Sequence, residues 1–235
     1  MRNYMKKVFT MLKADLIEWT RIKTAIIVSM LQPVVMVIAF GLSSKHGSGT
    51  QFDYYMPGIL AIAVMFSVTF SAGYETISDR ERRLVDDVVL SPVSYSSFIV
   101  SRLLSALIKC MLPTGAALLI GVIFFGVKMP HFFTIVLAYI LTAVICAGLG
   151  MMVGAFTNYL AFEGMVNFFL VPSMFFGGIF FPIENLGGFG KVVRFFAITP
   201  AVELFRYGLT GEIIVGSMLS NYIIILAYAI IFFIF

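Results

Sequence analysis

Residues 54–74 read YYMPGILAIAVMFSVTFSAGY, and residues 75–94 read ETISDRERRLVDDVVLSPVS. The first segment has 21 residues and no charged side chain. As an α-helix it would be about 31 Å long, which is enough to cross the ~30 Å hydrocarbon core of a bilayer. The second segment is dense in Asp, Glu and Arg. This change from apolar to charged is typical of a span that leaves the membrane.

Five further stretches share the length and the apolar composition of the first segment. The six predicted spans are 24–42, 54–74, 103–126, 132–156, 164–182 and 218–235. The whole chain is 60% hydrophobic and 12% charged, against about 25% charged residues in soluble domains. We therefore expect an all-α integral membrane protein with six transmembrane helices and a single transmembrane domain over residues 1–235. Cys110 and Cys146 fall within spans, where we expect buried thiols rather than a disulfide or a metal site.

The lysines and arginines predict the orientation of the chain. Ten of them precede the first span or lie between the second and third spans, against five on the opposite side. By the positive-inside rule, both termini and the charged segment are cytoplasmic in a multi-pass protein of the plasma membrane. The net charge of +4 suits anionic membrane lipids as partners and does not indicate nucleic-acid binding.

Two segments outside the spans have patterns typical of membrane-associated helices. In residues 4–20, apolar side chains recur at helical spacing up to Trp19, which predicts an N-terminal amphipathic interfacial helix rather than a polar tail. Residues 183–217 are semi-apolar but are interrupted by glycines and by Pro200. They predict one or two helices that enter the outer leaflet and return, and the alternative is an ordinary capping loop.

The charged segment continues the helical pattern of the second span. Oppositely charged side chains stand four residues apart, as at Asp79 and Arg83, which predicts ion pairs along an exposed helix. Ser91 and Pro92 would end this helix and also suit the start of a new one, with Ser91 as its N-cap. A helix, a break and a short surface helix form a shape that can dock to another protein. A solvated loop of mixed charge is the alternative.

Three motifs, taken in order, give the chain a family resemblance. They are Asp-Arg-Glu-Arg at 79–82 with Pro-Val-Ser at 92–94, Phe-Phe-Gly-Gly-Ile-Phe-Phe-Pro at 175–182, and Ile-Thr-Pro at 198–200 followed by Glu203 and Arg206. Within a frame of six spans they resemble the type-2 ABC exporter permeases, the membrane subunits of drug, polysaccharide and lipid exporters. The resemblance covers essentially the whole chain.

The resemblance implies contact with a separate ATP-binding cassette subunit. In that family a short coupling helix after the first cytoplasmic loop sits in a groove of the ATPase. The residues that match this contact are Glu81, Arg82, Ser91, Pro92, Val93, Ser94 and Tyr95. The family commonly has glycine after Glu-Arg, where this chain has Arg83. ATP and Mg²⁺ would bind to the partner subunit, and this chain would bind no cofactor and no metal.

A second permease copy or a close relative is the other expected partner, because one set of six helices leaves little room for a path. We predict the seam of this dimer at spans one and five, where Gly177 and Gly178 allow backbones to approach closely. Four phenylalanines of span five suit an apolar substrate path, although each could instead face lipid or the core. They are Phe168, Phe169, Phe175 and Phe176.

Three features in or near the spans have two interpretations each. Lys109 is an ionisable group inside a span and hence a functional candidate, but a lysine close to the interface can snorkel, which we favour. Glu163 either makes a polar contact at the cytoplasmic mouth or is solvated at the interface. Gly150 and Gly154, four residues apart, indicate close helix packing more than dimerisation.

The sequence carries no enzyme signature. It has no Gly-x-x-x-x-Gly-Lys-Ser/Thr phosphate loop and no His-Glu-x-x-His motif, and no serine in a span is matched with a base. We therefore expect the permease subunit of an ATP-driven ABC exporter, moving an amphipathic, drug-like, lipid-linked or polymeric substrate outward between two permeases. The alternatives are an ion-coupled secondary transporter, which usually shows internal repeats and paired intramembrane charges, and a membrane-embedded enzyme.

Overall fold

The computed structural model describes residues 2–45, 51–84, 94–180, 183 and 187–234, which are helical and contain no β-strand. The helices are α1 (Arg2–Arg21), α2 (Lys23–Lys45), α3 (Gln51–Glu81), α5 (Tyr95–Phe125), α6 (Phe132–Phe156), α7 (Tyr159–Phe176), α8 (Gly188–Val193), α9 (Ile198–Thr210) and α10 (Met218–Ile234). The prediction of an all-α fold is confirmed for these residues.

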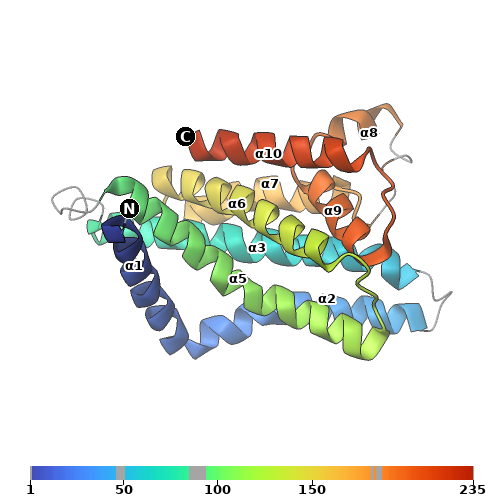
Figure 1. The fold of residues 1–235 in the computed structure, drawn as a ribbon, viewed down its shortest axis with the longest axis horizontal. Coiled ribbons are helices and arrows are strands. Elements are labelled where there is room, and N and C mark those ends of the chain that lie inside the picture. The colour runs from blue at the N-terminus through green and yellow to red at the C-terminus, as the bar shows by residue number, and fades with distance from the viewer. Residues whose placement is uncertain (1, 46–50, 85–93, 181–182, 184–186, 235) are drawn as a thin grey trace.

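The long helices run side by side along the long axis of the molecule, whereas α1 crosses one end of them (Figure 1). Both ends of the chain lie at this end, together with the last turn of α3 and the first turn of α5. The short helices α8 and α9 lie at the opposite end. We call these the α1 end and the α9 end of the bundle.

Five helices of the described chain are long and apolar enough to cross a membrane, namely α2, α3, α5, α6 and α7. α10 is apolar but shorter, since its 17 residues rise only about 26 Å. The chain is therefore a multi-pass membrane protein. Five of the six predicted spans are confirmed as helices of sufficient length, and the sixth, 218–235, stays a prediction.

The helices α5 and α7 differ in extent from the predicted spans that they contain or overlap. α5 begins two turns before the predicted start of the third span. The fifth span was expected at 164–182, but α7 runs from Tyr159 to Phe176. It begins earlier because the side chain of Asn158 accepts a hydrogen bond of 2.9 Å from a backbone N–H of the first turn, which caps the helix. It ends before Gly178, whose φ of +75° lies in the left-handed region.

α3 is the most buried span and forms the centre of the bundle. Its largest contact is with α6, where glycines let the two backbones touch. A Cβ atom on Gly154 would lie 2.7 Å from the carbonyl oxygen of Gly73, and one on Gly150 would overlap the carbonyl of Thr69. The predicted role of Gly150 and Gly154 in helix packing is confirmed, with α3 of the same chain as the partner.

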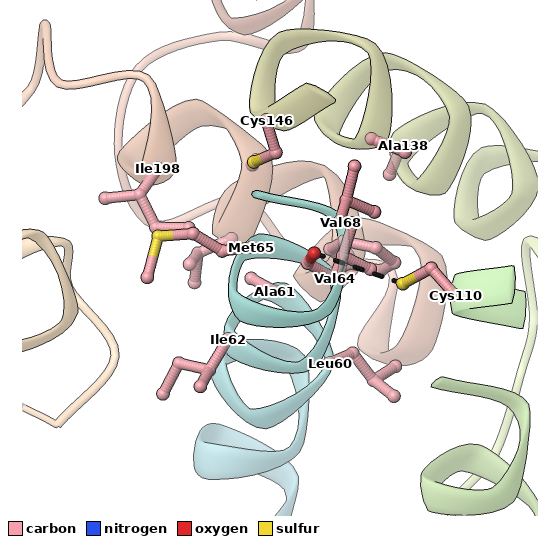
Figure 2. Close-up of a cluster of buried hydrophobic side chains, with 14 of the residues drawn as sticks. Leu60, Ala61, Ile62, Val64, Met65, Val68, Cys110, Ala138, Cys146 and Ile198 are labelled. Atoms are coloured by element: carbon pink, nitrogen blue, oxygen red, sulfur yellow. Dashed lines mark hydrogen bonds between the residues drawn. The ribbon is translucent and has the colours of Figure 1, made fainter. Parts of the chain in front are cut away.

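Figure 2 shows the core around the middle of α3, where side chains from α5, α6 and α9 converge. Cys110 points toward α3 and its thiol donates a weak hydrogen bond of 3.9 Å to the carbonyl of Val64. Cys146 approaches from α6. Both cysteines are buried and free, as predicted.

The two segments with membrane-associated patterns are both helical. α1 covers the predicted helix 4–20 and packs mainly on α5, with Val8 and Leu12 buried and Phe9 exposed. The segment 183–217 contains α8 and α9, which confirms short helices there, and α9 is buried against α3 and α6. That α1 lies on the membrane surface, and that 183–217 enters the outer leaflet, stay predictions.

Candidate functional site

Five charged side chains from three helices meet inside the protein at the α1 end. They are Asp15 of α1, Glu75 and Asp79 of α3, and Arg102 and Lys109 of α5, and we call them the ion-pair junction. The two acids of α3 stand one turn apart and the two bases of α5 stand two turns apart, so each pair shares one face of its helix. Two acids thus face two bases across the α3–α5 contact.

Within the ion-pair junction, Lys109 contacts two acids and Arg102 contacts three, the third being Glu75 at 4.0 Å. The Nη2 atom of Arg102 donates a 2.5 Å hydrogen bond to Oδ1 of Asp79, and its Nη1 atom donates to Asp15. The Nζ atom of Lys109 lies 2.6 Å from Oε1 of Glu75 and 3.5 Å from Oδ2 of Asp15. Because Asp15 contacts both bases, it ties α1 to α5, and the two bases tie α5 to α3.

The ion-pair junction is almost closed to solvent, since the side chains of Asp79 and Lys109 are 6% and 7% exposed. Ions buried to this degree depend on their partners, and removing one partner of such a pair typically costs about 3–5 kcal/mol. At Asp15, outside the spans, burial alone would raise the pKa, but the charge of Arg102, its hydrogen bond and the charge of Lys109 hold the pKa below its ordinary value. Asp15 is therefore ionised at neutral pH.

Lys109 is paired with acids on two other helices. It lies fourteen residues, or about 21 Å, from the start of α5. Its ammonium group contacts Glu75 of α3 and Asp15 of α1, and the snorkelling interpretation stays a prediction. Lys109 is therefore an ionisable group of a span with partners on two other helices.

The charged segment is helical to Glu81, whereas the predicted helix continues to Ser91 and Pro92. Residues 85–93 lie outside the described residues. The ion pairing of the segment also differs from the prediction. Asp79 contacts Arg102 of α5 and not Arg83. Arg83 itself has a φ of +55°, in the left-handed region that favours glycine. The resemblance places glycine at this position, and the φ of Arg83 is one that glycine adopts without strain.

Arg80 fastens the end of α3 to the end of α6. Its Nη1 atom donates a 2.6 Å hydrogen bond to the carbonyl of Ala155, and its Nη2 atom donates to the carbonyl of Thr157. These carbonyls belong to the last turn and the C-cap of α6. Carbonyls at a helix C-terminus lack partners within the helix and carry partial negative charge, so a cation there is favourable.

Four of the seven residues predicted to contact an ATPase are exposed at the α1 end: Glu81, Arg82, Ser94 and Tyr95. The other three, Ser91, Pro92 and Val93, lie outside the described residues. Arg82 makes an exposed ion pair of 3.3 Å with Glu18 of α1, a type of pair that stabilises a protein little. The four exposed residues stand directly beside the ion-pair junction along the chain, since two follow Asp79 and two begin α5.

The four phenylalanines predicted to line a substrate path are all exposed on α7: Phe168, Phe169, Phe175 and Phe176. Together with α2, α7 is the least buried of the spans. Both helices therefore present many exposed apolar side chains. A substrate path, a dimer seam and lipid contact all suit such a face, so the path stays a prediction.

The two glycines predicted at the dimer seam are buried within the chain. A Cβ atom on Gly177 would lie 2.5 Å from the side chain of Ile198. The carbonyl of Gly178 accepts a hydrogen bond of 3.2 Å from Arg206, which also pairs with Glu203 at 3.3 Å. The second and third sequence motifs thus form one buried unit at the α9 end. The seam stays a prediction, and its support comes from the exposed faces of α2 and α7.

Glu163 makes the polar contact that was one of its two interpretations. Its carboxylate accepts a hydrogen bond of 2.6 Å from the hydroxyl of Tyr74 on α3. This contact joins the first turns of α7 to the same part of α3 that carries the ion-pair junction.

The profile of the ABC-2 type transporter family matches residues 6–210 of the chain. The chain belongs to the ABC-2 type transporter family. Proteins of this family are membrane permeases without an ATPase site of their own, and the predicted resemblance is confirmed. The matched range includes the whole ion-pair junction and the Glu203–Arg206 pair. A search of curated proteins gives no match.

In this ABC-2 permease, sequence reasoning missed most of the ion-pair junction. A signal was present, because acids at 75 and 79 and bases at 102 and 109 are complementary and lie on two consecutive helices. This complementary pattern is missed when Arg102 is treated only as a charge outside the membrane. Nothing in the sequence joins Asp15 to these residues, since it is 87 positions away from Arg102.

Proposed function

We propose that this ABC-2 permease is the membrane subunit of an ATP-driven exporter, in which a separate ATP-binding subunit hydrolyses ATP. The observation that carries the proposal is the ion-pair junction beside an exposed surface. Glu81, Arg82, Ser94 and Tyr95 are exposed at the α1 end, and the two helix ends that present them are joined by the contact of Asp79 with Arg102. A partner that displaces this surface would displace α3 and α5 together.

The ion-pair junction extends this displacement to a third helix. Asp15 of α1 contacts both Arg102 and Lys109 of α5, so α1 would follow α5. Packed helices move between discrete arrangements and are not stretched continuously. Closure of two ATP-binding subunits would therefore reach the membrane as a shift of α1, α3 and α5 as a group.

We further infer that the α1 end faces the cytoplasm and that the membrane is the plasma membrane. This is supported by the excess of lysine and arginine in the segments of the α1 end. Both ends of the described chain lie at this end (Figure 1). The ATP-binding subunit would then meet the exposed residues from the side where ATP is available.

The substrate would cross between this chain and a second permease copy or close relative. The apolar faces of α2 and α7 support this pairing, because they are the least buried spans. Exposed aromatic residues of α7, such as Phe168 and Phe169, would give the path an uncharged wall. Such a wall suits an amphipathic, drug-like, lipid-linked or polymeric substrate.

The coupling surface is tested by Tyr95→Asp in the full chain, co-expressed with its ATP-binding subunit. An aspartate there would bury an unpaired charge in the contact. We expect normal insertion but loss of the co-purified subunit and of permease-stimulated ATP hydrolysis. Lys128→Asp, an exposed change at the α9 end, is the matched control. Stimulated hydrolysis at the normal level in Tyr95→Asp would remove this surface from the contact.

The pairing is tested by disulfide crosslinking in a chain whose two cysteines have been replaced. A cysteine at the exposed Phe168 of α7 should crosslink to a second copy, whereas one at the exposed Leu137 of α6 should not. Equal crosslinking at both positions would contradict a seam on α7.

One observation favours a second candidate, an ion-coupled secondary transporter. The ion-pair junction supplies the paired intramembrane charges that are typical of that class. The two candidates differ when the chain is reconstituted without an ATPase into vesicles that enclose a pH-sensitive dye. An exporter permease should pass no protons under a pH gradient, and a proton flux abolished by Lys109→Met would support the second candidate.

A further inference from the structure

A groove lies beside the ion-pair junction, between α5 and α10 and over the last turns of α6. Its volume is about 510 Å³, within the range of small-ligand sites. α5 and α10 both pack on α6 and scarcely touch each other, so α6 forms the floor. The floor residues share one face of α6 by their spacing. They are Val144, Gly148, Met151, Met152 and Ala155.

The lining of the groove is apolar except on one wall. Leu103 of α5 and Ala229 of α10 face the floor from either side. The charged groups of the lining, Asp79 and Arg102, are both members of the ion-pair junction. A molecule that fits this groove therefore has a long apolar part and one polar end.

The surroundings of the groove indicate a membrane lipid rather than a soluble molecule. α5 and α6 are long and apolar enough to be spans and α10 is an apolar helix, so we expect the groove to open toward hydrocarbon between α5 and α10, with Tyr95 and Ser96 lining its end at the α1 end. A soluble polar ligand would lose its hydration against the apolar walls.

The charge of the ion-pair junction indicates the head group of this lipid. The junction has three carboxylates and two bases, which leaves one negative charge in excess. Only two of these side chains line the groove, the carboxylate of Asp79 and the guanidinium of Arg102. One group of each sign matches a head group that carries both an ammonium and a phosphate, whereas a purely anionic head could use only Arg102.

We propose that the groove binds a zwitterionic phospholipid with a primary amine in its head group. One acyl chain lies along α6 over Met151 and Met152. The head group lies beside Asp79 and Arg102, where the ammonium can donate a hydrogen bond to the carboxylate of Asp79 and the phosphate can accept one from Arg102. The site is separate from the proposed substrate path on α7, and its end at Tyr95 adjoins the proposed contact with the ATP-binding subunit.

Photolabelling of the full chain tests this site. The chain is reconstituted in phosphatidylcholine vesicles that contain a small fraction of phosphatidylethanolamine with a diazirine on one acyl chain. After illumination, mass spectrometry should find label on Met151 and Met152 at several times the level on Phe133, which is 88% exposed on the same helix. A diazirine phosphatidylglycerol in the same vesicles should label the groove several-fold less.

Two substitutions that fill the groove complete the test. Ala155→Phe fills it from the floor at an exposed position, and Ala229→Phe fills it from α10. Either should lower the groove label several-fold, whereas Leu137→Phe on α6 outside the groove should not. Groove label equal to that on Phe133, or unchanged in both variants, would overturn the site. Equal labelling by phosphatidylglycerol would overturn the assignment of the head group.

Discussion

Replacing Lys109 with methionine tests the ion-pair junction most directly. The ammonium group lies 2.6 Å from Glu75 and 3.5 Å from Asp15, and the side chain is 7% exposed. Methionine keeps an unbranched apolar side chain but removes the charge. Two buried carboxylates would then face only Arg102, whose Nη1 atom is 4.0 Å from Glu75.

The structure sets the size of the expected effect. Removing one partner of a buried ion pair costs about 3–5 kcal/mol, and since Arg102 still neutralises part of the charge, we expect about 3 kcal/mol for Lys109→Met. For a chain of this length each kcal/mol corresponds to about 2–4 °C, so the unfolding midpoint should fall by roughly 6–12 °C. Thermal unfolding of the detergent-solubilised chain, followed by circular dichroism, measures this shift.

Two further variants decide whether the cause is the ion pair. Arg82→Ala breaks the exposed pair with Glu18, whose side chains are 61% and 60% exposed, and should cost no more than about 1 kcal/mol. Adding Glu75→Gln to Lys109→Met removes the orphaned acid, so the double variant should be more stable than the sum of the single effects predicts. A midpoint for Lys109→Met close to that of Arg82→Ala, or strictly additive effects, would refute the reasoning.

Three further predictions concern other contacts at the same helices. Gly150→Ala should lower the unfolding midpoint, because the new Cβ would meet the backbone of α3 at a cost of about 1–3 kcal/mol. The control Gly115→Ala has no atom within 4 Å of its new Cβ and should leave the midpoint equal or higher. Equal losses in the two variants would contradict the backbone contact. Arg83→Gly should raise the free energy of unfolding by up to about 1 kcal/mol, because a non-glycine residue at positive φ is strained. The control Arg82→Gly should lower the free energy of unfolding. A change of the same sign in both variants would contradict the strain at Arg83. The pKa of Asp15 is depressed in the folded chain, so its stabilisation is complete above the ordinary pKa of about 3.9 and is lost as the pH falls through the lower folded value. When the pH is lowered from 5 to 3, the unfolding midpoint of Asp15→Asn should therefore fall less than that of the wild type. If the two midpoints fell equally with pH, Asp15 would be excluded as a source of the pH dependence of stability.

The sequence predicts the spans well because each span is a local property of composition and length. It also predicts the packing of Gly150 and Gly154, since small residues one turn apart permit backbone contact whichever helix is the partner. The ion-pair junction depends instead on which helices become neighbours, and α1 meets α5 only through the fold. The early start of α5 has a local cause. Hydropathy places the start of the span near residue 103, but serines within the buried face of α5 lower the hydropathy without ending the helix.

α3 gives the proposed coupling a physical route between the two ends of the bundle. At the α1 end it carries the two acids of the ion-pair junction. At the α9 end Tyr54 in its first turns lies under the guanidinium of Arg206, 4.3 Å from the ring centre, and donates a 3.4 Å hydrogen bond to the carbonyl of Gly178. The 31 residues of α3 form a helix about 46 Å long.

The contact of α3 with α6 decides where movement can occur. Because glycines bring the two backbones together and Arg80 joins their ends, neither helix can slide along the other without steric overlap. We therefore expect α3 and α6 to move as one body. α7 is one of the two least buried spans and has only small contacts with α3 and α6, whereas α2 packs on α5 and α3. A displacement of α3 and α6 would therefore change their position relative to α7. Because we propose the substrate path on α7, movement there would open or close the path.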